Sequence, residues 1–291
     1  MKNILVSGSN GQLGSELREL CNFYDSFNFY FTDIEDLDIS DKHQLDFYVK
    51  SNKIDYFINC AAYTAVDKAE TDITNAFSIN ADSLKYISEV CIANKVFLIH
   101  ISTDYVFDGS KNTPYNEEDA VCPISEYGKS KLQGEEYVKA SGVKALIIRT
   151  SWLYSSYGHN FVKTILKLSK ERDSLTVVFD QTGSLTYAKD LAIAILDLIN
   201  DNKLEAVSFD IVNYSNEGVS SWYDVAFEIA NLSGSKCIIN PIETHEYPNA
   251  VAKRPTYSVL NKRKIKNNYG IIIPHWSVSL KACLDKLLGL Y

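Results

Sequence analysis

KNILVSGSNGQLG (residues 2–14) opens the chain with a short apolar run that ends in a glycine-rich turn. The apolar run predicts a buried strand over residues 2–7. The residues after the turn predict a helix over residues 12–21, whose inner face carries Leu13, Leu17 and Leu20. A GxxGxxG turn between a first strand and a first helix is the setting of the dinucleotide-binding fingerprint. The opening therefore predicts a Rossmann-like, doubly wound α/β fold.

The three glycines of this turn have separate expected tasks. Gly8 permits the tight turn, Gly11 lets the backbone approach a pyrophosphate, and Gly14 lets the helix pack closely on the strand. The pyrophosphate would accept hydrogen bonds from N–H groups at the helix N-terminus. The alternative is a glycine turn that binds no ligand. The position of the GxxGxxG turn at the first strand–helix junction argues against it.

An acidic residue is expected about 20 positions after the glycine turn, at the end of the second strand. Asp33 stands there. Its carboxylate would accept a hydrogen bond from the adenosine 2′-OH and repel a 2′-phosphate. No Lys or Arg occurs between Thr32 and Asp41 to neutralise such a phosphate. The stretch favours NADH over NADPH, although the neighbouring acidic residues leave open that Asp33 is an ordinary loop aspartate.

Strand and helix patterns alternate through the first half of the chain. Further strands are expected over 27–32, 54–60, 96–102 and 143–150, and helices over 40–51, 73–94 and 127–140. Ser40 is the expected N-cap of the first of these helices. Because the strands are almost continuously apolar, we expect a parallel sheet that helices cover on both faces.

The alternation loosens after residue 150. Helices are expected over 161–170, 191–200, 222–232 and 278–288, and one more strand over 206–212. We predict an NAD(P)-binding domain over residues 1–150, to which part of 175–215 returns. Residues 151–291 are predicted to form mainly a smaller α/β substrate domain.

The composition excludes several classes of protein. The 291 residues include 46% hydrophobic and 23% charged residues, which rules out a disordered chain or a small disulfide scaffold. A net charge of −8 disfavours a nucleic-acid binder. No apolar run is long enough for a membrane span, and the opening lacks the longer apolar region of a secretory signal. The six cysteines form no CxxC pair. We therefore expect a cytoplasmic protein with reduced thiols.

Tyr127 and Lys131 form a YxxxK motif on an expected helix, where positions i and i+4 share a face. A nearby ammonium lowers the pKa of a phenol, which can then exchange a proton with a carbonyl or alcohol oxygen. With 19 tyrosines in the chain, one such spacing is no more than chance provides. Thr103 adds weight because it follows an expected strand, and ligands of open α/β sheets bind beyond the carboxyl ends of strands.

Glycine turn, strand-end hydroxyl and YxxxK occur here in the order of the short-chain dehydrogenase/reductase superfamily. Longer stretches resemble its extended, sugar-nucleotide branch and, within it, the dTDP-4-dehydrorhamnose reductase family. They are NCAAYTAVDKAE (59–70), STDYVFDG (102–109), YGKSKLQGE (127–135), RTSWLY (149–154), NFVKT (160–164), FDQTGSLT (179–186) and RPTYSVL (254–260). The resemblance spans almost the whole chain.

This resemblance implies a reaction: hydride passes from NAD(P)H to C4 of dTDP-4-dehydro-6-deoxy-L-mannose, which becomes dTDP-L-rhamnose. It implies that Tyr127 donates the proton, that Lys131 lowers the Tyr127 pKa and holds the nicotinamide ribose, and that Thr103 polarises the carbonyl. The remaining implied cofactor contacts are Gln12, Leu13, Asp38, Ile39, Ala62, Tyr63 and Thr64. The implied contacts with the sugar nucleotide are Thr103, Asp104, Trp152, Asn160 and Arg254.

Two departures from the family pattern stand out. Leu185 occupies a position where the family often has proline. Some relatives bind magnesium with acidic side chains at a dimer interface. Glu16 matches one of these positions, but Lys189 stands where another carboxylate is expected, so we expect no metal. The family habit also implies a homodimer.

Three other functions remain open. A reductase of another 4-keto-6-deoxy sugar nucleotide would keep the same catalytic residues and differ only in its pocket. Some relatives are non-catalytic regulatory subunits that bind a nucleotide cofactor, and the intact Thr103, Tyr127 and Lys131 argue against that function. A dehydratase or epimerase is disfavoured because Tyr105 follows Asp104 where dehydratases carry a second carboxylate.

Overall fold

The structure is a computed structural model that describes residues 1–247 and 251–290. Its centre is a six-stranded sheet with the strand order β10-β5-β4-β3-β1-β2. All neighbouring strands in this sheet are parallel. The strands are β1 (Lys2–Ser7), β2 (Phe27–Phe31), β3 (Tyr56–Asn59), β4 (Phe97–Thr103), β5 (Ala145–Thr150) and β10 (Phe209–Tyr214). The predicted Rossmann-like α/β fold is confirmed.

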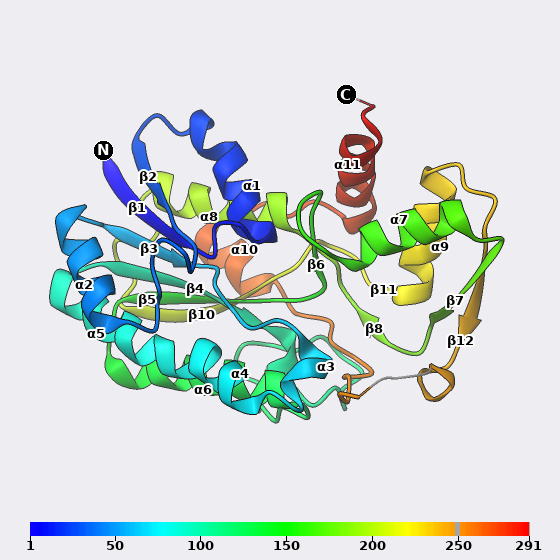
Figure 1. Cartoon of the computed structure of the whole chain (residues 1–291), viewed down its shortest axis with the longest axis horizontal. Coiled ribbons are helices and arrows are strands. Elements are labelled where there is room, and N and C mark those ends of the chain that lie inside the picture. Colours follow the sequence, from blue (N-terminus) through cyan, green and yellow to red (C-terminus); the bar gives the residue numbers. More distant parts are fainter. Residues whose placement is uncertain (248–250, 291) are drawn as a thin grey trace.

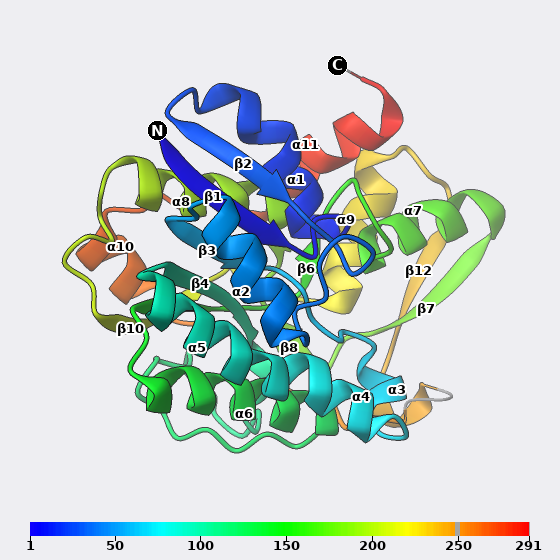
Figure 2. The same ribbon diagram turned by 60° about the vertical axis from the view of Figure 1, so that its left-hand side comes forward.

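Helices cover both faces of this sheet, as Figures 1 and 2 show. One face packs against α1 (Gln12–Leu20), α8 (Ala188–Asn200) and α10 (Arg263–Tyr269). The other packs against α2 (Lys42–Ser51), α5 (Ser83–Asn94) and α6 (Glu126–Ser141). Ile4 and Val6 of β1 point to the first face and Leu5 to the second, and all three are fully buried. Burial on both faces explains why the strands are continuously apolar.

The element bounds differ locally from the sequence expectations. The predicted N-cap Ser40 is wrong, because α2 begins at Lys42 and the Asp41 carboxylate accepts hydrogen bonds from the N–H groups of His43 and Gln44. The expected helix 73–94 is divided into α4 (Ile73–Phe77), a π-helical turn (Ser78–Asp82) and α5. A short helix, α3 (Val66–Ala69), precedes it.

The C-terminal half has a hydrophobic core of its own, beyond the carboxyl ends of the main strands. Its helices are α7 (Phe161–Glu171), α9 (Trp222–Leu232) and α11 (Trp276–Leu288). Its strands pair as β7 (Ser174–Val178) with β12 (Ile238–Ile242), β8 (Thr182–Gly183) with β11 (Ser220–Ser221), and β6 (Leu153–Tyr154) with β9 (Thr186–Tyr187). β7, β12 and α10 had no counterpart among the predicted elements.

The strand order reverses beside β1, because the chain runs from β1 to β2 on one side and then returns to β3 on the other. In open α/β sheets this reversal opens a crevice beyond the carboxyl ends of the strands, where ligands bind. Here that crevice faces the C-terminal half.

Candidate active site

A cavity of about 880 Å³ lies at this crevice. That volume is within the usual range of cofactor and small-molecule sites. One wall consists of the glycine turn, the segments after β3 and β4, and the first turns of α6. The opposite wall comes from residues 150–162, together with Leu185 and Trp222. The cavity thus joins the two halves of the chain.

Most residues that the sequence singled out line this cavity, although they come from many elements. They are Gly8, Gly11, Gln12, Leu13, Asp33, Asp38, Ile39, Ala62, Thr64, Thr103, Asp104, Tyr127, Lys131, Trp152 and Asn160. Gly14, Tyr63 and Arg254 are not among the lining residues. The fold therefore gathers most of the predicted site in one place.

The glycine turn has the tight geometry that its sequence predicted. Gly8 has a φ of +64°, and a Cβ there would lie 2.7 Å from the backbone nitrogen of Ala61. Gly14 supports the turn from behind, because a Cβ there would lie 2.5 Å from the Cα of Ser9. Gly11 is the N-cap of α1 and has no side chain with which to cap it. The first N–H groups of α1 are consequently left for a ligand.

Asp33 lies beside the glycine turn and is held by backbone hydrogen bonds. Its carboxylate accepts from the N–H of Asn10 and from its neighbour Ile34, each at 2.9 Å. A cation outside the segment considered in the sequence also lies here. Arg18 donates to the Ser9 hydroxyl at 2.7 Å, and its guanidinium stands 4.9 Å from the centre of the Phe31 ring. A carboxylate and a guanidinium thus both lie beside the glycine turn.

Tyr63 does not line the cavity, and its backbone pairs with Asn80, a residue of the π-helical turn. The N–H of Tyr63 donates to the Asn80 side chain at 2.8 Å, and the Asn80 amide donates back to the Tyr63 carbonyl at 3.0 Å. The phenol of Tyr63 donates to Asp72 at 3.0 Å. Its neighbours Ala62 and Thr64 line the cavity in its place. Asn80 was not predicted, because it lies in a π-helical turn within a stretch that was expected to be one regular helix.

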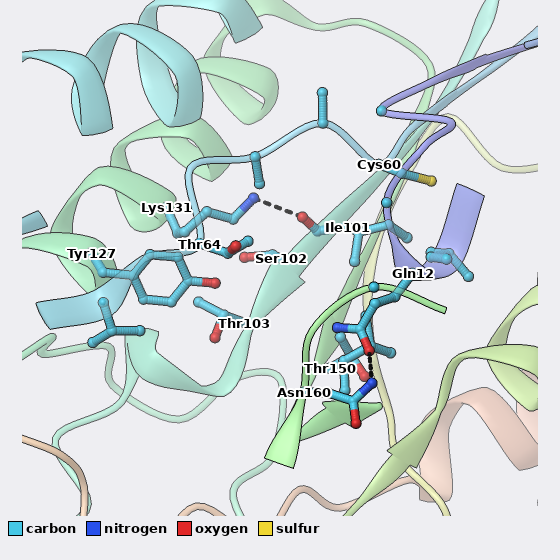
Figure 3. A pocket seen from close by; sticks show the side chains of 18 of the residues that line it. Gln12, Cys60, Thr64, Ile101, Ser102, Thr103, Tyr127, Lys131, Thr150 and Asn160 are labelled. Atoms are coloured by element: carbon cyan, nitrogen blue, oxygen red, sulfur yellow. Dashed lines mark hydrogen bonds between the residues drawn. The ribbon is translucent and has the colours of Figure 1, made fainter. Parts of the chain in front are cut away.

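Thr103 and Tyr127 meet at the end of β4 (Figure 3). The Thr103 hydroxyl donates to the Asp104 carboxylate at 3.1 Å and accepts from the N–H of Tyr105 at 3.2 Å. Tyr127 lies in the first turn of α6, and its ring meets the Tyr105 ring edge-on, with ring centres 5.5 Å apart. Desolvation raises the pKa of Tyr127 to about 12, although a hydrogen bond with Thr103 acts in the opposite direction.

Lys131 lies one helical turn after Tyr127, but its ammonium is directed at β4. It donates to the carbonyl of Ile101 at 2.7 Å (Figure 3). It also lies 3.3 Å from Nε2 of His100. Burial lowers the pKa of Lys131 to about 8, while the charge of Glu135 and the Cys60 thiol act to raise it. The expected lowering of the Tyr127 pKa by Lys131 is not what this geometry produces, because desolvation of the phenol dominates.

Asp104 is a buried carboxyl between Thr103 and the C-terminal half. Burial raises its pKa to about 7, against hydrogen bonds from Ser258 and Thr103 that lower it. The group therefore changes charge near neutral pH. Its charge in turn acts to raise the pKa of the neighbouring phenols Tyr105 and Tyr127.

The opposite wall is aromatic. Trp152 has a φ of +47° and stacks on Trp222, with ring centres 3.7 Å apart and planes inclined by 10°. Phe161 packs against Trp222 as well, with ring centres 4.6 Å apart and planes inclined by 53°. A positive φ in a bulky residue is rare and is tolerated where the surroundings enforce it. Trp222, at the start of α9, was expected to be helical but not to line the site.

Asn160 joins the two walls. It caps α7 by accepting from the N–H of Lys163 at 3.0 Å, and it donates to the Gln12 side chain at 2.9 Å (Figure 3). Arg254 does not line the cavity itself, but its side chain hydrogen-bonds to Tyr105, which does. Its guanidinium pairs with Asp67 at 2.6 Å, which is the ordinary salt bridge that competes with phosphate binding at this position.

The acidic residue considered for a metal, Glu16, lies on α1, two residues after Gly14. Glu16 is fully buried and accepts from the Ser155 hydroxyl at 2.5 Å, while Lys286 stands 4.0 Å away. Lys189 pairs with Glu19 at 3.3 Å. Across residues 1–247 and 251–290, no three His, Cys, Asp or Glu side chains come together as a metal site.

This fold and cavity define a class: Rossmann-like α/β proteins with a glycine turn at the first strand–helix junction and a ligand-sized cavity beyond the strand ends. Comparison with known proteins narrows the class. The family model described as "RmlD substrate binding domain" matches residues 1–288. The chain therefore belongs to this family.

Named relatives match over nearly their full length. A dTDP-4-dehydrorhamnose reductase from Aggregatibacter actinomycetemcomitans is 38% identical over 288 residues, which cover 97% of this chain and 98% of the relative. A crystal structure of a dTDP-4-dehydrorhamnose reductase from Clostridium acetobutylicum is 40% identical, has a TM-score of 0.92, and covers 98% and 99% of the two chains. The Bacillus anthracis enzyme, in complex with NADP, is 37% identical with a TM-score of 0.91, over 98% and 100%.

Among the described residues, no helix has both the length and the apolar character needed to span a membrane bilayer.

Proposed function

We propose that the protein reduces the C4 keto group of dTDP-4-dehydro-6-deoxy-L-mannose to give dTDP-L-rhamnose, with NADH or NADPH as hydride donor. The observation that carries this proposal is the shared cavity, which brings Thr103 and Tyr127 to the same space as the glycine turn. The names of the full-length relatives support the same substrate.

The residues present fit a dinucleotide cofactor. A Cβ at Gly8 would collide with Ala61, and the first N–H groups of α1 lack a side-chain cap. Both features suit a pyrophosphate that lies close to the backbone. Gly8, Gly11, Gln12 and Leu13 would hold this part of the cofactor. When bound, the reduced nicotinamide supplies the hydride.

The side chains at the end of β4 would bind the carbonyl oxygen of the substrate and donate a proton to it. Thr103 orients and polarises it by hydrogen bonding, and Tyr127 donates a proton to it as negative charge develops. A phenol whose pKa is raised to about 12 is protonated at neutral pH, which suits a proton donor in the direction of reduction. The Lys131 ammonium adds positive charge at the cavity wall, and the N–H that is not used by Ile101 or His100 would donate to the cofactor ribose.

The rest of the cavity would hold the sugar nucleotide. Asp104 and Trp152 are proposed to contact the sugar, and Asn160 the diphosphate end. Arg254 is proposed for a phosphate, for which its guanidinium has to compete with the pair to Asp67. Binding energy from the nucleotide would position the small reacting ketone.

We further propose that NADH is the preferred donor, that the protein is a cytoplasmic homodimer, and that no metal is needed. The Asp33 carboxylate beside the glycine turn supports the preference for NADH. Use of NADPH is the alternative. The NADP bound to the Bacillus anthracis relative and the guanidinium of Arg18 at the turn both favour that alternative.

The test is turnover of dTDP-4-dehydro-6-deoxy-L-mannose, generated in place by the preceding enzymes, with NADH and NADPH compared by loss of their absorbance. We expect turnover with both donors and the higher kcat/KM with NADH. Asp33→Asn should reduce the ratio of kcat/KM with NADH to kcat/KM with NADPH about tenfold, since it removes one charge-assisted hydrogen bond to the ribose. Folded protein that binds NADH but reduces nothing would contradict the substrate assignment. Other 4-keto-6-deoxy sugar nucleotides, and then a regulatory role, would be tested next.

A further inference from the structure

A row of polar side chains runs beneath the cavity through three neighbouring strands. Ser7 of β1 and Asn59 of β3 are direct register partners, as are Asn59 and His100 of β4. The Ser7 hydroxyl donates to Asn59 Oδ1 at 2.7 Å, and Asn59 Nδ2 lies 3.2 Å from His100 Nδ1. The row ends at Lys131, whose Nζ lies 3.3 Å from His100 Nε2.

All four side chains in this row are almost completely buried. Burying polar groups in an otherwise apolar sheet costs free energy unless their hydrogen bonds are satisfied. An apolar residue at position 100 would fit the pattern of β4, whose other members are mostly apolar. Because the row ends at Lys131, His100 can act on the ammonium of that lysine.

The His100 ring has to be neutral. Burial, reinforced by the charge of Lys131, holds the pKa of His100 well below its ordinary value. A neutral imidazole has one N–H donor and one acceptor nitrogen. Asn59 and Lys131 stand at the two ring nitrogens, so the hydrogen bond on one side decides which role the other nitrogen takes.

Two arrangements satisfy this row. With the Asn59 amide nitrogen at His100 Nδ1, Nε2 carries the proton and can donate only to an uncharged Lys131 amine. A half-turn of the amide brings its oxygen to Nδ1, and the Ser7 hydroxyl can then accept from the amide nitrogen. In that second arrangement Nε2 is free to accept a hydrogen bond from a charged Lys131.

We propose that His100 is a positioning residue for Lys131: Asn59 sets its tautomer so that Nε2 accepts a hydrogen bond from the ammonium, which stays charged and fixed beside the Ile101 carbonyl. The proposal deepens the proposed reductase function and rests on it, because it concerns the lysine beside the proton donor Tyr127. His100 lies behind Lys131 and acts only through it.

The other ionisable groups near Lys131 do not replace this acceptor. Glu135, one turn further along α6, is already paired with Arg149 at 2.7 Å and with the Ser102 hydroxyl at 2.5 Å. Burial raises the pKa of the Cys60 thiol after β3 to about 12, so it is uncharged. Tyr127 is likewise protonated at neutral pH. Asp104 interacts electrostatically with Tyr127 rather than with Lys131.

The test compares His100→Leu, which removes the acceptor, with His100→Gln, whose amide oxygen can still accept. Loss of a hydrogen bond to a charged group disfavours the ammonium, so the pKa of Lys131 should fall further below about 8. If the ammonium is the active form, kcat/KM declines as pH rises through that pKa. We expect the alkaline limb to move about one pH unit lower in His100→Leu. In His100→Gln it should return toward its wild-type position.

Two further variants separate positioning from folding. Ile99→Val alters a buried neighbour of His100 whose side chain points to the opposite face of β4. It should lower thermal stability without moving the alkaline limb. Asn59→Leu should move the limb in the wild-type background and leave it unmoved in a His100→Leu background, because Asn59 acts through His100.

A second measurement does not depend on turnover. An NMR titration of protein with 13C-labelled lysine, with the Lys131 signal assigned by Lys131→Arg, follows the same pKa directly. It should show the same one-unit shift in His100→Leu and its recovery in His100→Gln. An unshifted Lys131 titration in folded His100→Leu would overturn the proposal. Failure of the wild type to reduce the sugar nucleotide would instead overturn the proposed function and leave this measurement intact.

Discussion

The two walls of the cavity are built by different means. On the sheet wall, Thr103 and Lys131 are polar, buried and held by hydrogen bonds that the strands and α6 bring into register. On the outer wall, Trp152 and Trp222 are held by ring stacking, and Trp152 has a strained backbone. The sheet wall therefore holds ionisable and hydrogen-bonding groups in set positions. The outer wall presents a rigid aromatic surface.

This contrast indicates a division of labour. Proton transfer depends on distances of a few tenths of an ångström and on the charge of each group, so it suits a wall locked by a sheet. Recognition of a sugar ring depends on a flat apolar surface, which stacked aromatic side chains provide. Changes in the sheet wall should therefore affect kcat or stability, and changes in the outer wall should affect KM.

The largest effect is expected from Tyr127→Phe on the sheet wall. The variant keeps the ring and removes the proton donor, so kcat should fall about 10²- to 10⁴-fold. Steady-state assays with NADH measure this loss, and NADH titration by fluorescence should give an almost unchanged Kd. A variant that retains most of its kcat would show that another group donates the proton.

Glu135→Gln should be the most destabilising change behind the sheet wall. Glu135 and Arg149 are both nearly inaccessible and pair at 2.7 Å. Removing one partner leaves a buried charge uncompensated, which costs about 3–5 kcal/mol of unfolding free energy. Urea unfolding measures this cost. The matched control is Lys50→Gln, which breaks the exposed pair with Asp46 at 2.6 Å and should cost less than about 1 kcal/mol.

Asp104→Asn should change how stability depends on pH. The Asp104 pKa is raised from 3.8 to about 7, so folding favours the neutral carboxyl. The associated stability is complete below the unfolded-state pKa and is lost as pH rises through about 7. The side chain of Asp104→Asn is always neutral. As pH rises from about 4 to about 7, the free energy of unfolding of the wild type should therefore fall by a few kcal/mol relative to that of Asp104→Asn. Parallel stability curves for the two proteins would contradict the assignment.

The smallest effect is expected on the outer wall. Trp222→Leu removes the ring that supports Trp152, and stacking of this kind contributes about 0.5–1.5 kcal/mol. The KM for the sugar nucleotide should rise about two- to tenfold while kcat stays close to wild type. Phe227→Leu, an exposed position on the same helix, is the matched control and should change neither constant. A fall in kcat without a change in KM would contradict the assignment of substrate binding to the outer wall.

The sheet was predictable from sequence because its strands are buried on both faces and its helices have clear apolar faces. β7 and β12 were missed because they form a small two-stranded sheet, with about half of their residues exposed. The N-cap of α2 was misplaced by one residue, since Ser40 and Asp41 are both good caps and only the backbone conformation selects between them.

Features that depend only on neighbours along the chain could be predicted before the fold was known. The glycine turn at the first strand–helix junction and the shared helix face of Tyr127 and Lys131 follow from local geometry. Contacts between distant segments were decided only by the tertiary structure. Arg254 forms a salt bridge with Asp67 from a distant segment. The Lys131 ammonium contacts His100 and Ile101 of β4. A helical period fixes the direction in which a side chain leaves the backbone, but the partner at its far end is supplied by another strand.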